Sequence, residues 1–127
     1  MTTQPERRKS PRVKHGLPVK VSADEMDFIT QTQDIGVNGA LFRLEKAVPL
    51  MSRLAMTLLV PSHEKKGTTK KIVCNGVVVR CEPFHIKETR GEYNIAVYFT
   101  ALKDSDKKAL MKYVNAEAGG GGREVVG

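Results

Sequence analysis

The chain has 127 residues, of which 40% are hydrophobic and 28% charged, and its formal net charge is +7. These values are typical of a soluble globular protein with one domain, long enough to bury a core. No apolar run approaches the roughly 20 residues that a membrane-spanning helix needs, and the first residues do not resemble a signal peptide. We therefore expect a cytoplasmic protein without a membrane segment.

The positive charge is concentrated at the start of the chain. Residues 1–20 carry six Lys or Arg residues and one Glu, and six minus one leaves +5 of the total of +7. Because residues 1–13 contain too few apolar side chains to build a core, we predict that they form a flexible basic arm. Such charge points to an anionic partner, and a solvated arm is the alternative.

Hydrophobic residues at every second position predict strands in the segments 17–22, 53–60 and 93–99. Alternate side chains of a strand lie on the same face, so each of these strands turns one face toward a core. The expected inward residues are Leu17, Val19, Val21, Leu54, Met56, Leu58, Val60, Tyr93, Ile95, Val97 and Phe99. Segments 27–33 and 39–45 are predicted as two further strands, the second covered on both faces.

Residues 70–83 admit two interpretations. Asn75-Gly76 between apolar runs is a strong hairpin signal, whereas a glycine inside a long strand indicates a bulge. A one-residue bulge at Gly76 would bring the apolar residues on both sides of it to one face, namely Ile72, Cys74, Val77, Val79 and Cys81. We therefore favour one bent strand.

The two cysteines are not expected to form a disulfide. On one continuous strand Cys74 and Cys81 would lie about 23 Å apart at ~3.3 Å per residue, and in a hairpin they would face other residues. Their spacing matches no metal motif. Free thiols suit a reducing cytosol.

The hydrophobic period becomes helical in residues 104–118. One stripe of this segment collects Leu110, Met111, Tyr113 and Val114, with lysines opposite. Asp104 or Ser105 is a natural N-cap, and residues 119–122, which are all glycine, are expected to end the helix. Residues 118–127 would then form a flexible Gly-rich tail.

These elements predict an all-β fold. Several short, mostly antiparallel strands at this spacing favour a six-stranded antiparallel β-barrel over residues 14–117, closed by the C-terminal α-helix. The basic arm of residues 1–13 precedes the barrel, and the tail of residues 118–127 follows it.

Catalysis is not indicated. The chain has no nucleophile elbow, no HExxH motif, no P-loop and no Rossmann glycine pattern. His15, His63 and His85 are scattered among turn residues and charges, so we interpret them as surface residues. We expect no enzyme activity, no metal site and no cofactor.

The stretch QDIGVNGALF, residues 33–42, contains a second group of polar and glycine residues between two predicted strands. Taken alone, Asp34, Gly36, Asn38 and Gly39 make a plain β-turn. Together with the basic arm they also allow a functional interpretation, because a carboxylate at Asp34 can accept hydrogen bonds from the two N–H donors of a guanine edge. Arg8 and Arg12 can grip phosphates bidentately and stack on a purine. The pattern therefore favours a phosphorylated guanine nucleotide.

RRKSPR followed by DIGVNG resembles the two signature motifs of the PilZ domain, a receptor module for the bacterial second messenger cyclic di-GMP. The family pattern is Arg-x-x-x-Arg and then Asp/Asn-x-Ser-x-x-Gly. Arg8 and Arg12 match the first motif, with Arg7 before it, and Asp34 and Gly39 match the ends of the second. The similarity extends over the later strands and the helix, from about residue 6 to residue 117.

The resemblance implies that cyclic di-GMP binds on the outer surface of the barrel. The implied ligand-binding residues are Arg7, Arg8, Arg12, Asp34, Gly36, Asn38 and Gly39. Ligand binding would order the arm, and a separate downstream protein would sense this change. Gly36 stands where the family has serine, and one missing hydrogen bond costs about 0.5–1.5 kcal/mol, a 2- to 13-fold loss of affinity.

Two other functions compete with this one. A degenerate PilZ adaptor would act by protein–protein interaction with weak or no nucleotide binding, and Gly36 keeps this alternative open. A basic barrel could also bind nucleic acid, but single-strand binders offer aromatic stacking platforms. The chain has no Trp, and Tyr93 and Phe99 are expected in the core. We therefore expect no nucleic-acid partner.

Overall fold

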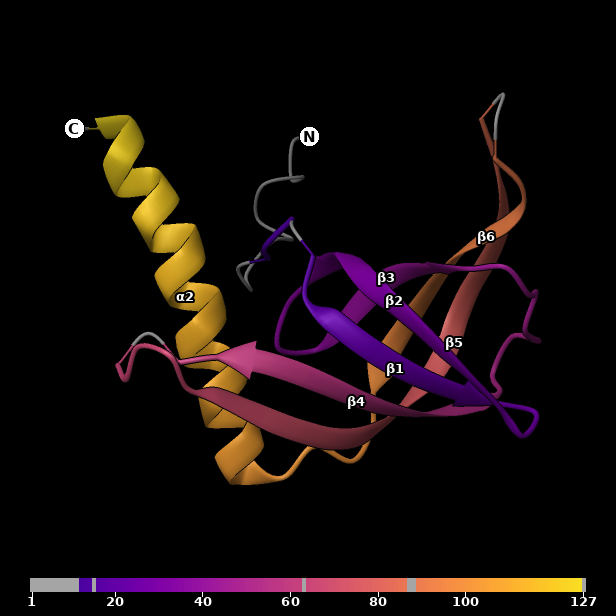
Figure 1. Cartoon of the computed structure of the whole chain (residues 1–127), viewed down its shortest axis with the longest axis horizontal. Helices are drawn as coiled ribbons and strands as arrows, with labels where there is room; N and C mark the ends of the chain where they lie inside the picture. Colours follow the sequence, from indigo (N-terminus) through magenta and orange to yellow (C-terminus); the bar gives the residue numbers. More distant parts are fainter. Residues whose placement is uncertain (1–11, 15, 63, 87–88, 127) are drawn as a thin grey trace, which may run out of the picture.

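A computed structural model describes residues 12–14, 16–62, 64–86 and 89–126, and it describes side chains except at 85–90 and beyond 118. Within these residues, antiparallel strands form a closed barrel in the order β1–β2–β3–β6–β5–β4 (Figure 1). The elements are β1 Pro18–Ala23, β2 Met26–Ile35, β3 Gly39–Leu44, β4 Arg53–Pro61, β5 Thr69–Ile86, β6 Thr89–Phe99 and α2 Asp104–Val126. The predicted six-stranded antiparallel barrel with a C-terminal helix is confirmed.

The alternating pattern identified the barrel core. Of the expected inward residues, all are buried except Tyr93, which is partly buried and packs against the core. Phe42 of β3 is fully buried, while Leu41 on the opposite face is partly covered. β1 pairs with both β2 and β4, so no strand of the described barrel is left without a neighbour on either side. Closure of this kind removes the exposed sheet edges that favour aggregation.

β5 is one continuous strand, as favoured, but the predicted position of its bulge is wrong. The register against β6 shifts between Val78 and Arg80 rather than at Gly76. Gly76 is buried, and a Cβ added there would meet Met56 Sδ at 3.0 Å and Val97 Cβ at 3.1 Å. The glycine therefore makes room for core side chains, and alternation continues through it until Val79, the extra residue of the bulge.

The two cysteines are both free, as predicted. Cys74 lies inside the barrel and Cys81 lies on β5 beyond the bulge. Burial, with a smaller contribution from the charge of Asp106, raises the pKa of the Cys74 thiol to about 11. Because the thiolate is the reactive form, Cys74 is chemically inert near neutral pH.

α2 covers the barrel with its first turns and extends beyond it with its last ones (Figure 1). Leu110, Tyr113 and Val114 are buried as predicted, but the expected place of Met111 on the same stripe is wrong, since it is 42% exposed. The buried stripe is narrower than predicted because the helix packs on the barrel along one line.

The predicted end of the helix at its glycines is also wrong, because α2 continues through residues 119–122 to Val126. Glycine lowers helix propensity by about 1 kcal/mol but does not forbid helical geometry. Each residue added to an existing helix gains one hydrogen bond, and residues 119–126 contain no proline that would interrupt it.

Candidate functional site

Arg12 and Asp34 form an ion pair that joins the two sequence motifs. Arg12 Nε donates to Asp34 Oδ1 at 2.8 Å across 22 positions of the chain, and both side chains are partly buried. Arg12 Nη2 also makes a long contact of 3.5 Å with the carbonyl oxygen of Gly39. A guanidinium has five N–H donors, so these contacts leave others for an anion.

The backbone beside Arg12 holds this arginine on the barrel. Val13 N–H donates to Ile35 O at 2.8 Å, and Ile35 N–H donates to Val13 O at 2.9 Å, which forms an antiparallel bridge to the last residue of β2. Val13 is 5% exposed and belongs to the core. Arg12 and Val13, which the sequence assigns to the arm, therefore lie against the barrel in a defined register.

The turn between β2 and β3 carries the second motif. Gly36 N–H donates to Gly39 O at 2.9 Å and closes the turn, while the carbonyl of Asn38 accepts from Phe99 N–H at 2.9 Å. Asn38 is exposed at the tip of this turn. The turn is thus tied both to itself and to β6, and its exposed surface lies beside Asp34.

Gly39 has a structural reason to be glycine. It opens β3 opposite Tyr98, and a Cβ added there would collide with the carbonyl oxygen of Val97. The last position of the second motif therefore allows β3 and β6 to approach each other closely. This close approach fixes the position of the turn.

The structure brings Arg12, Asp34, Gly36, Asn38 and Gly39 together at one end of β2 and β3. The predictions for Arg7, Arg8, His15 and His63 concern residues outside the described part of the chain, and the His85 side chain is outside it too.

Sequence reasoning did not single out Tyr98 as a neighbour of this site. Tyr98 pairs with Gly39 and is 55% exposed on the outer surface of β6. The sequence did contain a signal for this position. Tyr98 alternates with the inward residues Val97 and Phe99, so the pattern predicts that its side chain points outward.

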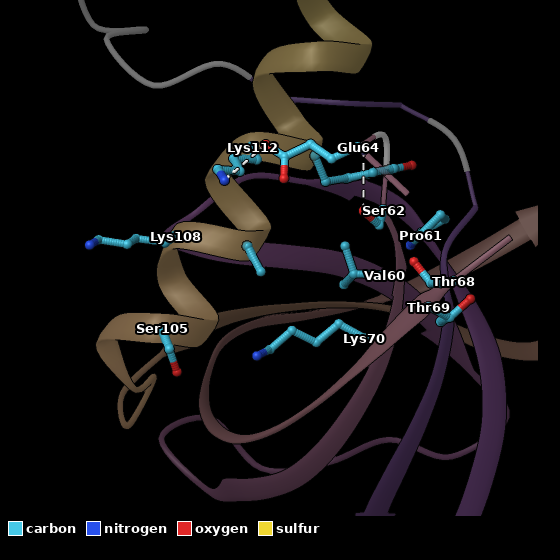
Figure 2. Close-up of a pocket in the computed structure, with 12 residues that line it drawn as sticks. Val60, Pro61, Ser62, Glu64, Thr68, Thr69, Lys70, Ser105, Lys108 and Lys112 are labelled. Carbon is cyan, nitrogen blue, oxygen red and sulfur yellow. Dashed lines mark hydrogen bonds and ion pairs between the residues drawn. The ribbon is translucent and has the colours of Figure 1, made fainter. Parts of the chain in front are cut away.

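A cavity of about 310 Å³ lies between α2 and the loop that joins β4 to β5 (Figure 2). Lys112 Nζ donates to Glu64 Oε2 at 3.0 Å, and both residues line the cavity, while Lys70 Nζ lies 3.5 Å from Asp106 Oδ1. The cavity shares no lining residue with the two motifs. Each of these two lysines already faces a carboxylate, so the cavity offers less free positive charge than its lysines suggest.

Two negative observations concern the described residues alone. No group of three or more His, Cys, Asp or Glu side chains there is arranged to hold a metal ion. No helix of that part combines the length and apolar character needed to cross a bilayer.

Comparison with known proteins gives one family and several similar folds. Residues 6–116 match the PilZ domain family. The chain is similar to MotI/DgrA of Bacillus subtilis, with a TM-score of 0.69 and 19% identity over 85% of this chain and 49% of that one. It is also similar to K. pneumonia MrkH in its apo state, with a TM-score of 0.71 and 15% identity over 92% of this chain and 53% of that one.

The PilZ domain of Escherichia coli YcgR, whose structure is described as containing c-di-GMP, gives a TM-score of 0.64 and 13% identity over 94% of this chain and 97% of that one. The chain thus spans about half the length of MotI and MrkH, and nearly all of this single domain. No curated protein matches it in sequence.

Proposed function

The chain belongs to the PilZ domain family, a family of cyclic di-GMP receptors, and we propose that it binds cyclic di-GMP where its two motifs meet. The proposed ligand-binding residues are Arg7, Arg8, Arg12, Asp34, Gly36, Asn38 and Gly39. In this proposal the protein is a cytoplasmic receptor and not an enzyme.

The observation that carries the proposal is the 2.8 Å contact between Arg12 Nε and Asp34 Oδ1. It places the last arginine of the first motif beside the first residue of the second, although 22 positions separate them. A solvated basic tail would not need a partly buried partner, nor the backbone bridge at Val13 that holds Arg12 there. Both features suit a preformed half of an anion site.

The chemistry of these groups matches a guanine nucleotide with two phosphates. A carboxylate has about four lone-pair positions, so Asp34 can keep Arg12 and still accept from a guanine edge. The guanidinium groups of Arg8 and Arg12 would face phosphate oxygens or stack on the base. Because the attraction is between charges near the surface, affinity should fall as salt is added.

We infer that the signal is the ordering of the arm on the barrel, which a partner protein then reads. Arg12 and Val13 already lie in register against β2, so ligand contacts with Arg7 and Arg8 would continue an existing attachment.

Calorimetric titration of the intact chain with cyclic di-GMP tests the proposal and gives the stoichiometry. Arg8→Ala and Arg12→Ala should each lose most of the affinity while thermal unfolding stays nearly unchanged. Lys14→Ala, which removes the same charge from an exposed residue outside both motifs, should retain binding within about two-fold. Wild-type affinity in both arginine variants would rule out this site.

An adaptor without nucleotide binding is the second candidate, and Gly36 is the observation that favours it. The family serine is missing at this position, so one hydroxyl contact is lost. A thermal-shift assay separates the two candidates. Stabilisation by millimolar cyclic di-GMP supports the receptor, and its absence supports the adaptor.

A further inference from the structure

The outer surface of β5 and β6, together with the segment before β4, carries a group of exposed and partly exposed hydrophobic residues next to the candidate site. We call Met51, Val77, Val79, Ala96 and Tyr98 the apolar face. Met51 is 72% exposed, and Val79 and Tyr98 are each 55% exposed. Exposed apolar side chains scattered singly are ordinary, but a contiguous group indicates an interaction surface.

The strand register shows that these residues are contiguous. Tyr98 lies directly opposite Val77, and Ala96 lies opposite Arg80 beside the bulge residue Val79. Met51 joins the face from the other side, since its N–H donates to Val78 O at 2.7 Å. The five side chains therefore occupy neighbouring positions on two paired strands and the segment attached to them.

Met51 is fixed on this face rather than carried by a free loop. Its φ is +70°, in the left-handed region that non-glycine residues seldom adopt. Val78 N–H donates to Ser52 O at 2.9 Å, which completes the attachment of this segment to β5. A strained backbone that presents an exposed methionine is a feature more often found at functional surfaces.

Positive charge flanks the apolar face. Arg53 lies opposite Val77 on β4, and Arg80 follows Val79 on β5, and both are exposed. A second copy of this chain would bring arginines against arginines, which disfavours self-association. A segment that carries carboxylates beside apolar side chains would satisfy both the charge and the hydrophobic surface.

The apolar face also borders the nucleotide site. Asp34 lies opposite Leu41 on β3, and Leu41 lies opposite Ala96 on β6. One row of outward residues thus runs from the carboxylate of the second motif into the apolar face. A partner seated here would touch the surface where the arm and nucleotide are proposed to lie.

We propose that the apolar face docks a segment of a partner protein in which apolar residues alternate with or adjoin Asp and Glu. This inference deepens the proposed relay to a partner and rests on it. The partner's apolar side chains would cover Val79 and Tyr98, and its carboxylates would face Arg53 and Arg80.

The opposite side of the barrel provides a matched control. Ile29 is 75% exposed and Val73 is 59% exposed, but Lys20 and Thr57 stand between them in the row across β2, β1, β4 and β5. Ile29→Asp therefore introduces the same charge on an exposed apolar residue outside the apolar face.

The test measures binding of two synthetic peptides to the intact chain without nucleotide, one of alternating Leu and Asp and one of alternating Leu and Lys. The Leu-Asp peptide should bind, and Val79→Asp or the double charge reversal Arg53→Glu with Arg80→Glu should weaken it at least about ten-fold. Ile29→Asp should change it less than about two-fold, and the Leu-Lys peptide should not bind.

The proposal is overturned if neither peptide binds, if both bind equally, or if Ile29→Asp weakens binding as much as Val79→Asp. It is also overturned if sedimentation shows a dimer that Val79→Asp dissociates, because a second copy then covers the face. Peptide binding is measured without nucleotide, whereas calorimetric titration with cyclic di-GMP is a separate measurement that needs no peptide. The failure of the docking proposal is thereby distinguishable from the failure of nucleotide binding.

Discussion

Two ion pairs of nearly equal length lie in different parts of the molecule. Arg12–Asp34 spans 2.8 Å with side chains 31% and 23% exposed, and Lys112–Glu64 spans 3.0 Å with side chains 66% and 70% exposed. The first sits beside a backbone bridge and a hydrogen-bonded turn, whereas the second joins two solvent-exposed side chains that line a cavity. Length alone therefore does not indicate which pair has a function.

The difference lies in what fixes each partner. At the motif site, main-chain hydrogen bonds define where the charges stand, and little side-chain entropy remains to be lost when a ligand binds. At the cavity, two long flexible side chains must be ordered in water before they attract each other. The following substitutions test this contrast, from the largest expected effect to the smallest.

Gly39→Ala should break the backbone support of the motif site. The added Cβ would collide with Val97 O between β3 and β6, so we expect unfolding free energy to fall by about 3 kcal/mol or more. Denaturant unfolding measures this. Gly67→Ala is the control, because no atom lies within 4 Å of the added Cβ, so its φ of +84° is the one feature there that disfavours alanine. Equal losses in both variants would contradict the steric explanation.

Asp34→Asn should weaken cyclic di-GMP binding strongly and stability little. The amide keeps one acceptor but loses the charge and turns an NH₂ group toward the donors of guanine. Hydrogen bonds to charged groups contribute about 1.5–3 kcal/mol, so calorimetry should show a loss of roughly 10- to 160-fold. Asp27→Asn, in an exposed pair 3.9 Å from Lys20, should leave the affinity unchanged. A similar loss in both would indicate a general charge effect.

Gly36→Ser restores the family residue and should strengthen binding. The positive-φ glycines of the described chain are Gly67 and Gly91, so the backbone at Gly36 is one that serine can adopt. One recovered hydrogen bond of about 0.5–1.5 kcal/mol predicts a 2- to 13-fold gain in calorimetric affinity. Weaker binding by this variant would show that the buried position of Gly36 has no room for a hydroxyl.

The fold was predictable because the period of two survives in almost every strand. The prediction failed at β5, where the apolar residues Val77 and Val79 suggested that the strand changes its inward face at Gly76. The register in fact shifts after Val78. Sequence alone does not show that Met56 and Val97 fill the space beside Gly76. The same holds for Met111, since only the line of contact between α2 and the barrel decides which helical residues are covered.

The candidate site was predictable as a set of residues but not as a geometry. The order and spacing of the motifs indicated Arg12 and Asp34, while the bridge between Val13 and Ile35 that holds them together depends on strand register. The apolar face could not be predicted from the sequence for the same reason. Met51 and Val79 become neighbours only because the segment before β4 forms backbone hydrogen bonds with Val78.

Lys112→Ala tests the weak side of the comparison and should have the smallest effect. Exposed ion pairs contribute about 0–1 kcal/mol, so its loss should lower the unfolding free energy by less than about 0.5 kcal/mol and leave cyclic di-GMP affinity unchanged. Glu64→Ala is the matched partner variant, and the double variant gives the coupling energy. The unfolding and titration experiments should be done in low salt, because screening is then weakest and the contribution of the ion pair is largest. A coupling energy well above 1 kcal/mol, or a loss of nucleotide binding, would contradict this expectation. The contact between α2 and the β4–β5 loop would then contribute to the site, although both of its side chains are exposed.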